Sequence, residues 1–320
     1  MKKLNTIDAD TLQAIAYEPI SFLVEDLLPQ GLHLLAGAPK IGKSWLALWL
    51  CLRVAQGKSL WNFPTHSCEV LYLCLEDSFQ RIQSRLFDLT EDAPPTLHFA
   101  VMAEQLHSGL VEQIEQFLKE HPATGLVVID TLQRIRTVSN DANPYANDYR
   151  DIGVLKGLAD RHHIAVLLIH HLRKLNDDDP MNMISGTTGL NGATDSNFVL
   201  RKSKRRENTA TLYCIGRDIA YRELSLKFNG DTHIWDLLSD DGEQTGEPHG
   251  RILALLSPLL REQQEICATA KVLLEKIDPA GLESLTPNSF SHQIRKSIDA
   301  LRRGGICVSF RKSNGERLIC

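Results

Sequence analysis

The sequence has no apolar run that approaches the ~18 residues of a membrane-spanning helix. Its first eight residues also lack the apolar stretch of a secretory signal peptide. None of its seven cysteines forms a C-x-x-C pair, and several lie in apolar runs, as Cys74 does, where a thiol acts as a small hydrophobic group. These absences exclude a membrane protein and a disulfide-rich secreted domain, and they predict a soluble protein of the reducing cytoplasm.

Neither sign of charge is in large excess, and the net charge of −5 excludes a uniformly basic nucleic-acid coat protein. The charge is uneven, since residues 251–320 carry 11 Lys and Arg against 7 Asp and Glu, whereas the rest of the chain carries 24 against 33. A chain of 320 residues also exceeds what one compact core usually uses. We therefore predict a large domain over residues 1–237, an acidic linker with Gly and Pro over 238–250, and a small domain over 251–320.

Short apolar runs alternate with helical patterns through the first two-thirds of the chain. Near-continuous apolar runs of this length are typical of strands buried on both faces of a parallel sheet. Their alternation with helices predicts a doubly wound, mostly parallel α/β sheet with flanking helices. The expected strands are residues 32–36, 70–75, 126–129 and 164–169, the expected helices are 44–55, 79–89, 110–119 and 149–161, and hairpin strands follow at 197–202, 209–216 and 224–229.

The last seventy residues have the pattern of a winged helix. Apolar periodicity predicts helices at residues 251–260 and 268–277, and a third helix to residue 303 with Thr286 as N-cap and Pro287 in its first turn. Strands at 306–310 and 317–320 would flank the turn at Asn314 and Gly315. Such a module meets either duplex DNA or another protein. The candidate phosphate contacts are Arg295, Arg302, Arg311 and Lys312.

Residues 37–44 match G-x-x-x-x-G-K-[ST] in full, directly after one expected strand and at the start of a helix. In that setting backbone amides wrap the phosphates of ATP, Lys43 meets the β- and γ-phosphate oxygens, and the Ser44 hydroxyl binds Mg²⁺. The alternative is a chance glycine-rich turn, which the agreement of motif, strand and helix makes a poor explanation. The predicted nucleotide-binding segment is Gly37, Ala38, Pro39, Lys40, Ile41, Gly42, Lys43, Ser44 and Trp45.

Carboxylates follow two other expected strands. Asp130 ends residues 126–129, which makes it a Walker B candidate that would hold Mg²⁺; its alternative role is to cap the next turn. Glu76 and Asp77 end residues 70–75, and Asp130 is followed by Thr131, which is no base. We therefore predict Glu76 as the base that activates water, with Asp77 as a cap of the following helix.

A pair of histidines, His170 and His171, ends the strand expected at residues 164–169. A neutral imidazole at this position can donate to the γ-phosphate and relay its loss to the loop that follows. A zinc-ligand pair lacks further Cys or His residues at ligand spacing, and a histidine that merely ends a strand is the other alternative. We predict His171 as a catalytic sensor.

Four segments in this order resemble the RepA-type AAA_25 group of RecA/DnaB-like ATPases, and the likeness covers about residues 20–235. The resemblance implies a RecA-like fold in which the catalytic glutamate follows the strand after the P-loop helix, as Glu76 does. It also implies a ring such as a hexamer, with ATP sites between subunits that a neighbour's arginine completes. Arg217 is the first candidate for that arginine and Arg201 the second; a surface ion pair is the alternative for both. The matching segments are residues 32–45, 73–78, 128–132 and 169–174.

The resemblance implies an ATP-driven DNA helicase or translocase in the replication of a plasmid or mobile element, a homo-oligomer that binds single-stranded DNA. Arg173 and Lys174 are candidate contacts to its phosphates. The alternative is an ATP-controlled switch that binds nucleic acid or protein without unwinding, which the acidic run at residues 177–179 favours because it would repel DNA. A small-molecule kinase shares the P-loop, but the sequence lacks an Arg-rich lid segment.

Overall fold

The structure, a computed structural model, describes residues 4, 6–15, 17, 20–136, 144–173, 177–186, 188–202, 204, 207–241, 248–262, 265–279, 285–313 and 316–320. They belong to two compact units, one spanning Ser21–Glu243 and the other combining Met1–Ile20 with Gln244–Cys320. The N-terminal residues that the sequence-based division assigns to the first domain thus group with the second unit. Among the described residues, no helix is both long enough and apolar enough to cross a lipid bilayer.

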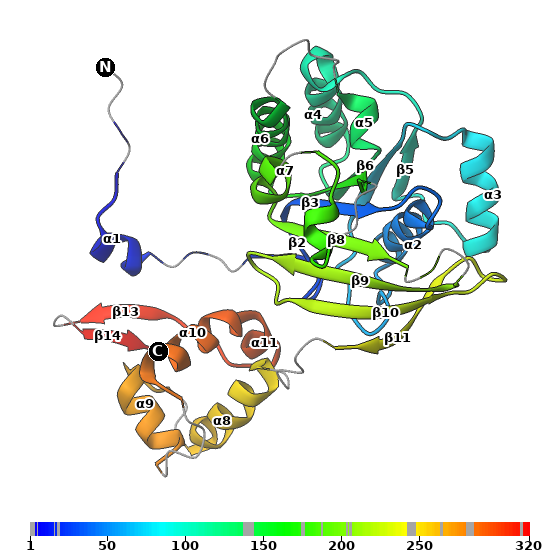
Figure 1. Cartoon of the computed structure of the whole chain (residues 1–320). Coiled ribbons are helices and arrows are strands. Elements are labelled where there is room, and N and C mark those ends of the chain that lie inside the picture. Colours follow the sequence, from blue (N-terminus) through cyan, green and yellow to red (C-terminus); the bar gives the residue numbers. More distant parts are fainter. Residues whose placement is uncertain are drawn as a thin grey trace. The chain divides into compact units, whose positions relative to one another are not determined.

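The larger unit is built on a nine-stranded sheet in the order β11-β10-β9-β8-β3-β7-β6-β4-β5 (Figure 1). The strands from β8 to β5 in this order pair in parallel, and β9, β10 and β11 add an antiparallel meander at one edge. Their bounds are β3 Gly31–Gly37, β4 Glu69–Cys74, β5 Leu97–Ala100, β6 Thr124–Asp130, β7 Ala165–His171, β8 Ser196–Arg201, β9 Thr209–Gly216, β10 Arg222–Phe228 and β11 Trp235–Asp240. A separate small hairpin joins β1 Phe22–Val24 to β2 Leu28–Pro29.

Helices cover both faces of this sheet, which gives two hydrophobic cores. One core lies between the sheet and α2 (Lys43–Gln56) with α3 (Phe79–Leu89), and the other lies under α4 (Val111–Glu120), α5 (Leu132–Ile135), α6 (Pro144–His162) and α7 (Thr188–Ala193). Side chains of one strand alternate between the two cores; in β7, Leu167 and Ile169 face α2 whereas Val166 and Leu168 face α6. The central strands are buried on both faces, which explains their continuous apolar sequences. The prediction of a RecA-like, mostly parallel α/β sheet is confirmed.

Two strands were not predictable from periodicity, and one predicted linker boundary differs. Strand β5 is a short edge strand whose side chains are mostly half-buried, and β11 is an edge strand with several exposed residues, so neither forms an apolar run. Residues 238–240, which the sequence suggests are linker, end β11, and residues 248–250 begin α8 (Pro248–Glu262). Residues 242–247 of the predicted linker lie outside the described residues.

The smaller unit contains α1 (Ala9–Ala14) and the C-terminal elements. Their order is α8, β12 (Ala268–Thr269), α9 (Ala270–Ile277), α10 (Pro287–Lys296), α11 (Ile298–Arg303), β13 (Phe310–Ser313) and β14 (Glu316–Ile319), with a sheet ordered β12-β14-β13. Thr286 caps α10 as predicted, by accepting a hydrogen bond from the Ser289 amide. The predicted third helix is interrupted at Ser297, and the strand expected from residue 306 begins at Phe310. The Asn314–Gly315 turn and the Lys312 side chain are outside what the structure describes.

Two of the cysteines are bonded, contrary to the expectation of free thiols. Strands β12 and β14 pair antiparallel, with Ala268 opposite Ile319, and this brings Cys267 and Cys320 to a Cα–Cα distance of 4.1 Å with a disulfide between them. The two residues are 53 positions apart, so sequence spacing did not indicate the pair. Cys51, Cys74 and Cys214 are free and buried, as expected for thiols within apolar runs.

Candidate nucleotide site

The P-loop joins the carboxyl end of β3 to α2, and Lys43 lies inside it. Its Nζ donates hydrogen bonds to the carbonyl oxygens of Gly37 (2.7 Å) and Ala38 (3.1 Å). The side chain is buried, and burial lowers the pKa of Lys43 to about 8, although the carboxylates of Asp130 and Glu76 oppose this shift. A buried cation held only by carbonyl oxygens suits a loop that would receive an anionic phosphate group.

Gly42 is the N-cap of α2 and has the left-handed backbone angle φ 108°. A side chain there would be strained, and its Cβ would lie 3.1 Å from ring atoms of Trp235. Trp235, the fully buried first residue of β11, donates from Nε1 to the Gly42 carbonyl at 3.2 Å. The far edge strand therefore supports the P-loop through a residue that sequence analysis did not single out.

The oxygen ligands expected for Mg²⁺ meet beside the P-loop. The Ser44 hydroxyl donates to Asp130 Oδ2 at 2.8 Å, and the Tyr72 hydroxyl donates to the same oxygen at 3.0 Å. Burial raises the pKa of Asp130, while these two hydrogen bonds act in the opposite direction. Thr131, not Asp130, is the N-cap residue of α5, so the alternative capping role of Asp130 is wrong. A hydroxyl and a carboxylate are hard oxygen donors that fit Mg²⁺.

Glu76 follows β4 and Leu75, on the same sheet edge as the P-loop. Its Oε1 accepts a hydrogen bond from Thr131 Oγ1 at 3.1 Å, and the residue is exposed. The alternation along β4 and β6 assigns Glu76 and Asp130 to the face that α2 covers, since Cys74 and Val128 pack in that core. An exposed carboxylate beside the P-loop is positioned to contact water.

Asp77 does not cap α3, and that prediction is wrong. Ser78 is the N-cap, and its side chain accepts from the Arg81 amide. The Asp77 carboxylate instead pairs with Arg81 Nη1 at 2.9 Å and Arg85 Nη1 at 2.6 Å. These two ion pairs hold Asp77 against α3 and leave Glu76 as the carboxylate at this strand end with a contact to the β6 edge.

The two histidines at the end of β7 differ in their surroundings. His170 is buried, its Nε2 lies 3.0 Å from the Ser185 carbonyl oxygen, and burial lowers its pKa to about 4, so the ring is neutral. His171 is half-buried and stands opposite Gly37 in the β3–β7 register, on the α2 face. Its Nδ1 has no hydrogen-bond partner within the described part of the chain. His171 is thus the histidine adjacent to the start of the P-loop.

Two further predicted residues make contacts within the chain. The Trp45 ring stacks on His233 with centroids 4.5 Å apart, and the Arg85 guanidinium lies 5.4 Å above it. Arg217 follows β9 at the edge where the parallel strands begin, opposite the P-loop edge, and its Nη1 lies 3.2 Å from Asp195 Oδ1. The structure thus does not bring Arg217 to the P-loop of its own chain, and its role stays a prediction.

The fold and this site define a P-loop nucleotide-binding α/β protein, since lysine, hydroxyl and two carboxylates gather at the carboxyl edge of a parallel sheet. The chain belongs to the AAA_25 family, described as an AAA domain, whose profile matches residues 2–177. The range includes Lys43, Glu76, Asp130 and His171. Comparison with curated protein sequences gave no match.

Two solved structures share the fold. An isolated ATPase domain aligns with a TM-score of 0.55 at 16% sequence identity, over 66% of this chain and 85% of that domain. A DnaB-like replicative helicase, solved in a study of its interactions with primase, aligns with a TM-score of 0.54 at 16% identity, over 66% of this chain and 58% of that one. At this identity the likeness concerns the fold, and it places the larger unit among helicase-type ATPase domains.

Proposed function

We propose that this protein is an ATP-hydrolysing motor that acts on nucleic acid as a helicase or translocase, in the replication of a plasmid or other mobile element. The observation that carries the proposal is the set of Lys43, Ser44, Asp130 and Glu76 at one sheet edge, in a fold shared with DnaB-like helicases. The two parts of this proposal are separable, because the site concerns hydrolysis and the fold concerns the motor.

The chain's own groups divide the chemistry among them. Lys43 exchanges its bonds to the Gly37 and Ala38 carbonyls for phosphate oxygens, and the Ser44 and Asp130 oxygens hold Mg²⁺. Bound Mg²⁺ neutralises charge that develops on the phosphate oxygens. Glu76, oriented by the Thr131 hydroxyl, positions a water molecule and accepts its proton.

We further propose that His171 senses the γ-phosphate and that β7 passes this on to the following segment. The residues after β7 fold back on its end: the Ser185 amide donates to the His171 carbonyl at 3.0 Å, and the Arg173 amide donates to the Met183 carbonyl at 2.8 Å. His170 contacts the Ser185 carbonyl from the other face. Movement of either histidine would therefore reach residues 183–185 directly.

The motor proposal predicts stimulation of ATP hydrolysis by single-stranded DNA. If the smaller unit is a winged helix that recruits DNA, its basic residues add to this effect; Arg295 already lies 4.3 Å from the centre of the Phe310 ring. We expect a steady-state ATPase rate at least about tenfold higher with single-stranded DNA, falling steeply as salt rises because phosphate contacts release counterions. The same slow rate with and without DNA or RNA would remove the motor part of the proposal and leave the ATP site untouched.

A ring with an arginine supplied in trans is the second expected property, and Arg217 is its first candidate. We predict that Arg217→Ala binds ATP normally but hydrolyses it about 10³-fold more slowly. Mixing it with Lys43→Ala protein should restore activity, because the second variant lends its Arg217 to the intact sites of the first. The matched control is Arg201→Ala, the second candidate.

Arg217 also pairs with the buried Asp195, so the same experiment tests a purely structural role. Loss of activity that mixing does not restore, together with a lower melting temperature, would assign Arg217 to fold stability. A monomer with and without ATP in light scattering would contradict the ring.

An ATP-controlled switch without unwinding is the second candidate function, and the fold-back of the segment after β7 favours it. Asp177 and Asp179 accept hydrogen bonds from the Asp179 and Met181 amides, so the acidic run is built into this segment. Hydrogen–deuterium exchange with ADP and with a non-hydrolysable ATP analogue would test it. A γ-phosphate-dependent change in protection of residues 177–186, without DNA-stimulated turnover, supports the switch over the motor.

A further inference from the structure

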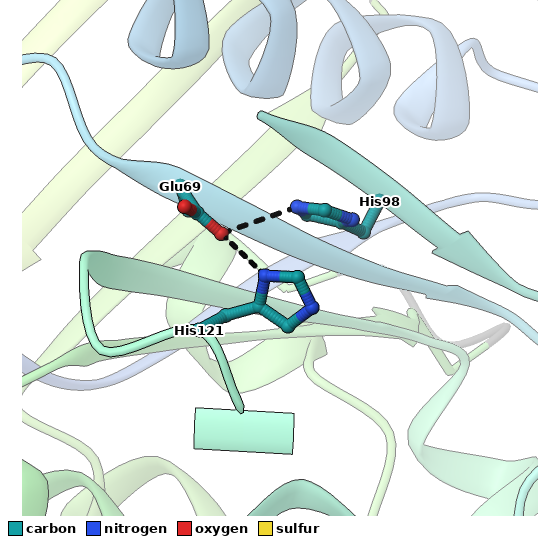
Figure 2. A group of neighbouring side chains, drawn as sticks. All are labelled: Glu69, His98 and His121. Atoms are coloured by element: carbon teal, nitrogen blue, oxygen red, sulfur yellow. Dashed lines mark hydrogen bonds and ion pairs between the residues drawn. The ribbon is translucent and has the colours of Figure 1, made fainter. Parts of the chain in front are cut away.

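Three side chains gather at the sheet edge opposite the P-loop (Figure 2). Glu69 begins β4, His98 is the second residue of β5, and His121 follows α4 directly. Glu69 Oε2 lies 3.2 Å from His98 Nε2 and 2.8 Å from His121 Nδ1. Since parallel strands begin at this edge and carry the nucleotide site at the other, the cluster takes no part in the site described above.

The spacing of these atoms is close to that of ligands around one metal ion. One ligand atom from each residue can be chosen so that all lie within 4.8 Å of one another. Four-coordinate zinc with bonds of about 2.0–2.2 Å separates its ligand atoms by roughly 3.3–3.5 Å. Small rotations of the three side chains would therefore close the site. Among the described residues this is the only such group of three or more His, Cys, Asp and Glu side chains.

Neighbouring groups hold the two imidazoles in place. Phe117 of α4 stacks on His121, with centroids 4.3 Å apart, and meets the His98 ring edge-on at 5.2 Å. The His121 carbonyl accepts hydrogen bonds from the amide and the hydroxyl of Thr124, at 3.0 and 2.7 Å, which fixes the backbone between α4 and β6. A site whose ligands are already oriented loses little side-chain entropy on binding.

The donor types decide which ion the cluster would take. Two imidazole nitrogens and one carboxylate suit Zn²⁺ and its first-row neighbours, whereas Mg²⁺ prefers oxygen ligands and retains its water. The side chains of Glu69, His98 and His121 are 23%, 27% and 32% exposed, so solvent can reach a fourth position. Each proton that a ring now directs at Glu69 would move to the ring's other nitrogen or, from a doubly protonated ring, to water.

We propose that Glu69, His98 and His121 form a binding site for a divalent transition-metal ion of the Zn²⁺ class, with water as the fourth ligand. The ion would join β4, β5 and the end of α4 at the edge of the sheet. This inference does not depend on the ATPase proposal, because its residues and its tests are separate from the nucleotide site.

The test is titration of the untagged, chelator-treated, nucleotide-free full chain with Zn²⁺ and Co²⁺. We expect one Zn²⁺ per chain in calorimetry, the strong visible absorption of low-coordinate Co²⁺, and a higher melting temperature with Zn²⁺. Glu69→Gln, His98→Asn and His121→Asn should each lower Zn²⁺ affinity at least about tenfold, since losing even a supporting contact of a metal ligand costs this much.

The matched control is His66→Asn, which removes another histidine paired with a glutamate, Glu25, but without a third ligand. Asp130→Asn is the second control and separates binding at the Mg²⁺ ligands. Both should keep the wild-type Zn²⁺ affinity. Equal affinity in the cluster variants, or binding that only Asp130→Asn abolishes, would overturn the proposal.

A measurement on the wild-type protein covers the case in which a cluster variant fails to fold. Long-range ¹H–¹⁵N spectra report the ring nitrogens of the twelve histidines. Zn²⁺ should shift the ring signals of two histidines with one equivalent of metal. No shifted imidazole at saturating Zn²⁺ would show that the cluster is only a hydrogen-bonded His–Glu–His group.

Discussion

Replacing Lys43 with alanine is expected to lower the rate of ATP hydrolysis at least about 100-fold and to weaken nucleotide binding. The ammonium group is the cation inside the P-loop, and its hydrogen bonds to the Gly37 and Ala38 carbonyls show that it reaches the loop's interior. Alanine leaves the phosphate oxygens with amide donors alone. Steady-state hydrolysis and equilibrium binding of a fluorescent ATP analogue measure the two effects.

The matched control is Lys40→Ala, a lysine of the same loop whose side chain is exposed. It should hydrolyse ATP within about threefold of the wild-type rate, because an exposed charge is screened by solvent. Near-wild-type hydrolysis by Lys43→Ala would contradict the assignment of the P-loop as a phosphate site. Melting temperature serves as the check on folding for both variants.

The pH dependence of binding gives Lys43 a second signature. Burial lowers its pKa to about 8 in the nucleotide-free protein, so the free site loses its positive charge as pH rises through 8. A phosphate prefers the charged form, and the affinity for ATP should therefore fall as pH increases above 8. Lys43→Ala should lack this decline. Stability has the opposite sign, since the unfolded chain binds more protons at Lys43 between pH 8 and 10.5, and the free energy of unfolding rises with pH there.

The parts of this protein that sequence analysis predicted are those encoded by neighbouring residues. The P-loop, the Thr286 cap and α3 each depend on a short motif or a local periodicity, and each lies where the sequence indicates. The convergence of Lys43, Asp130 and Glu76 was also predictable, because residues at the carboxyl ends of parallel strands meet at one sheet edge.

The parts that sequence analysis missed depend on residues far apart in the chain. Trp235 supports Gly42 across 193 positions, and nothing around either residue indicates the contact. Glu69, His98 and His121 come from three elements with no common spacing, so only the strand order and the length of α4 bring them together. The ion pairs of Asp77 replaced the predicted cap because Ser78 was available as a better N-cap next to it.

Glu76→Gln is expected to keep ATP affinity and to lower the hydrolysis rate by about 10²–10⁴-fold. Glutamine has the shape of glutamate and its amide oxygen still accepts the hydrogen bond from the Thr131 hydroxyl, so the local structure is retained. It cannot accept the proton of the attacking water. Single-turnover hydrolysis and equilibrium binding of the same ATP analogue separate the chemical step from binding.

Asp77→Asn is the matched control, because it removes the neighbouring carboxylate at the same strand end. That carboxylate is engaged by Arg81 and Arg85, and its loss should lower the melting temperature while hydrolysis stays within a few-fold of wild type. Slow hydrolysis in Glu76→Gln alone identifies the base, whereas equal losses in both variants would indicate that negative charge at this edge matters more than a particular proton acceptor. Wild-type turnover by Glu76→Gln would transfer the role to another group, and Asp77 would then be the carboxylate nearest in sequence to take it.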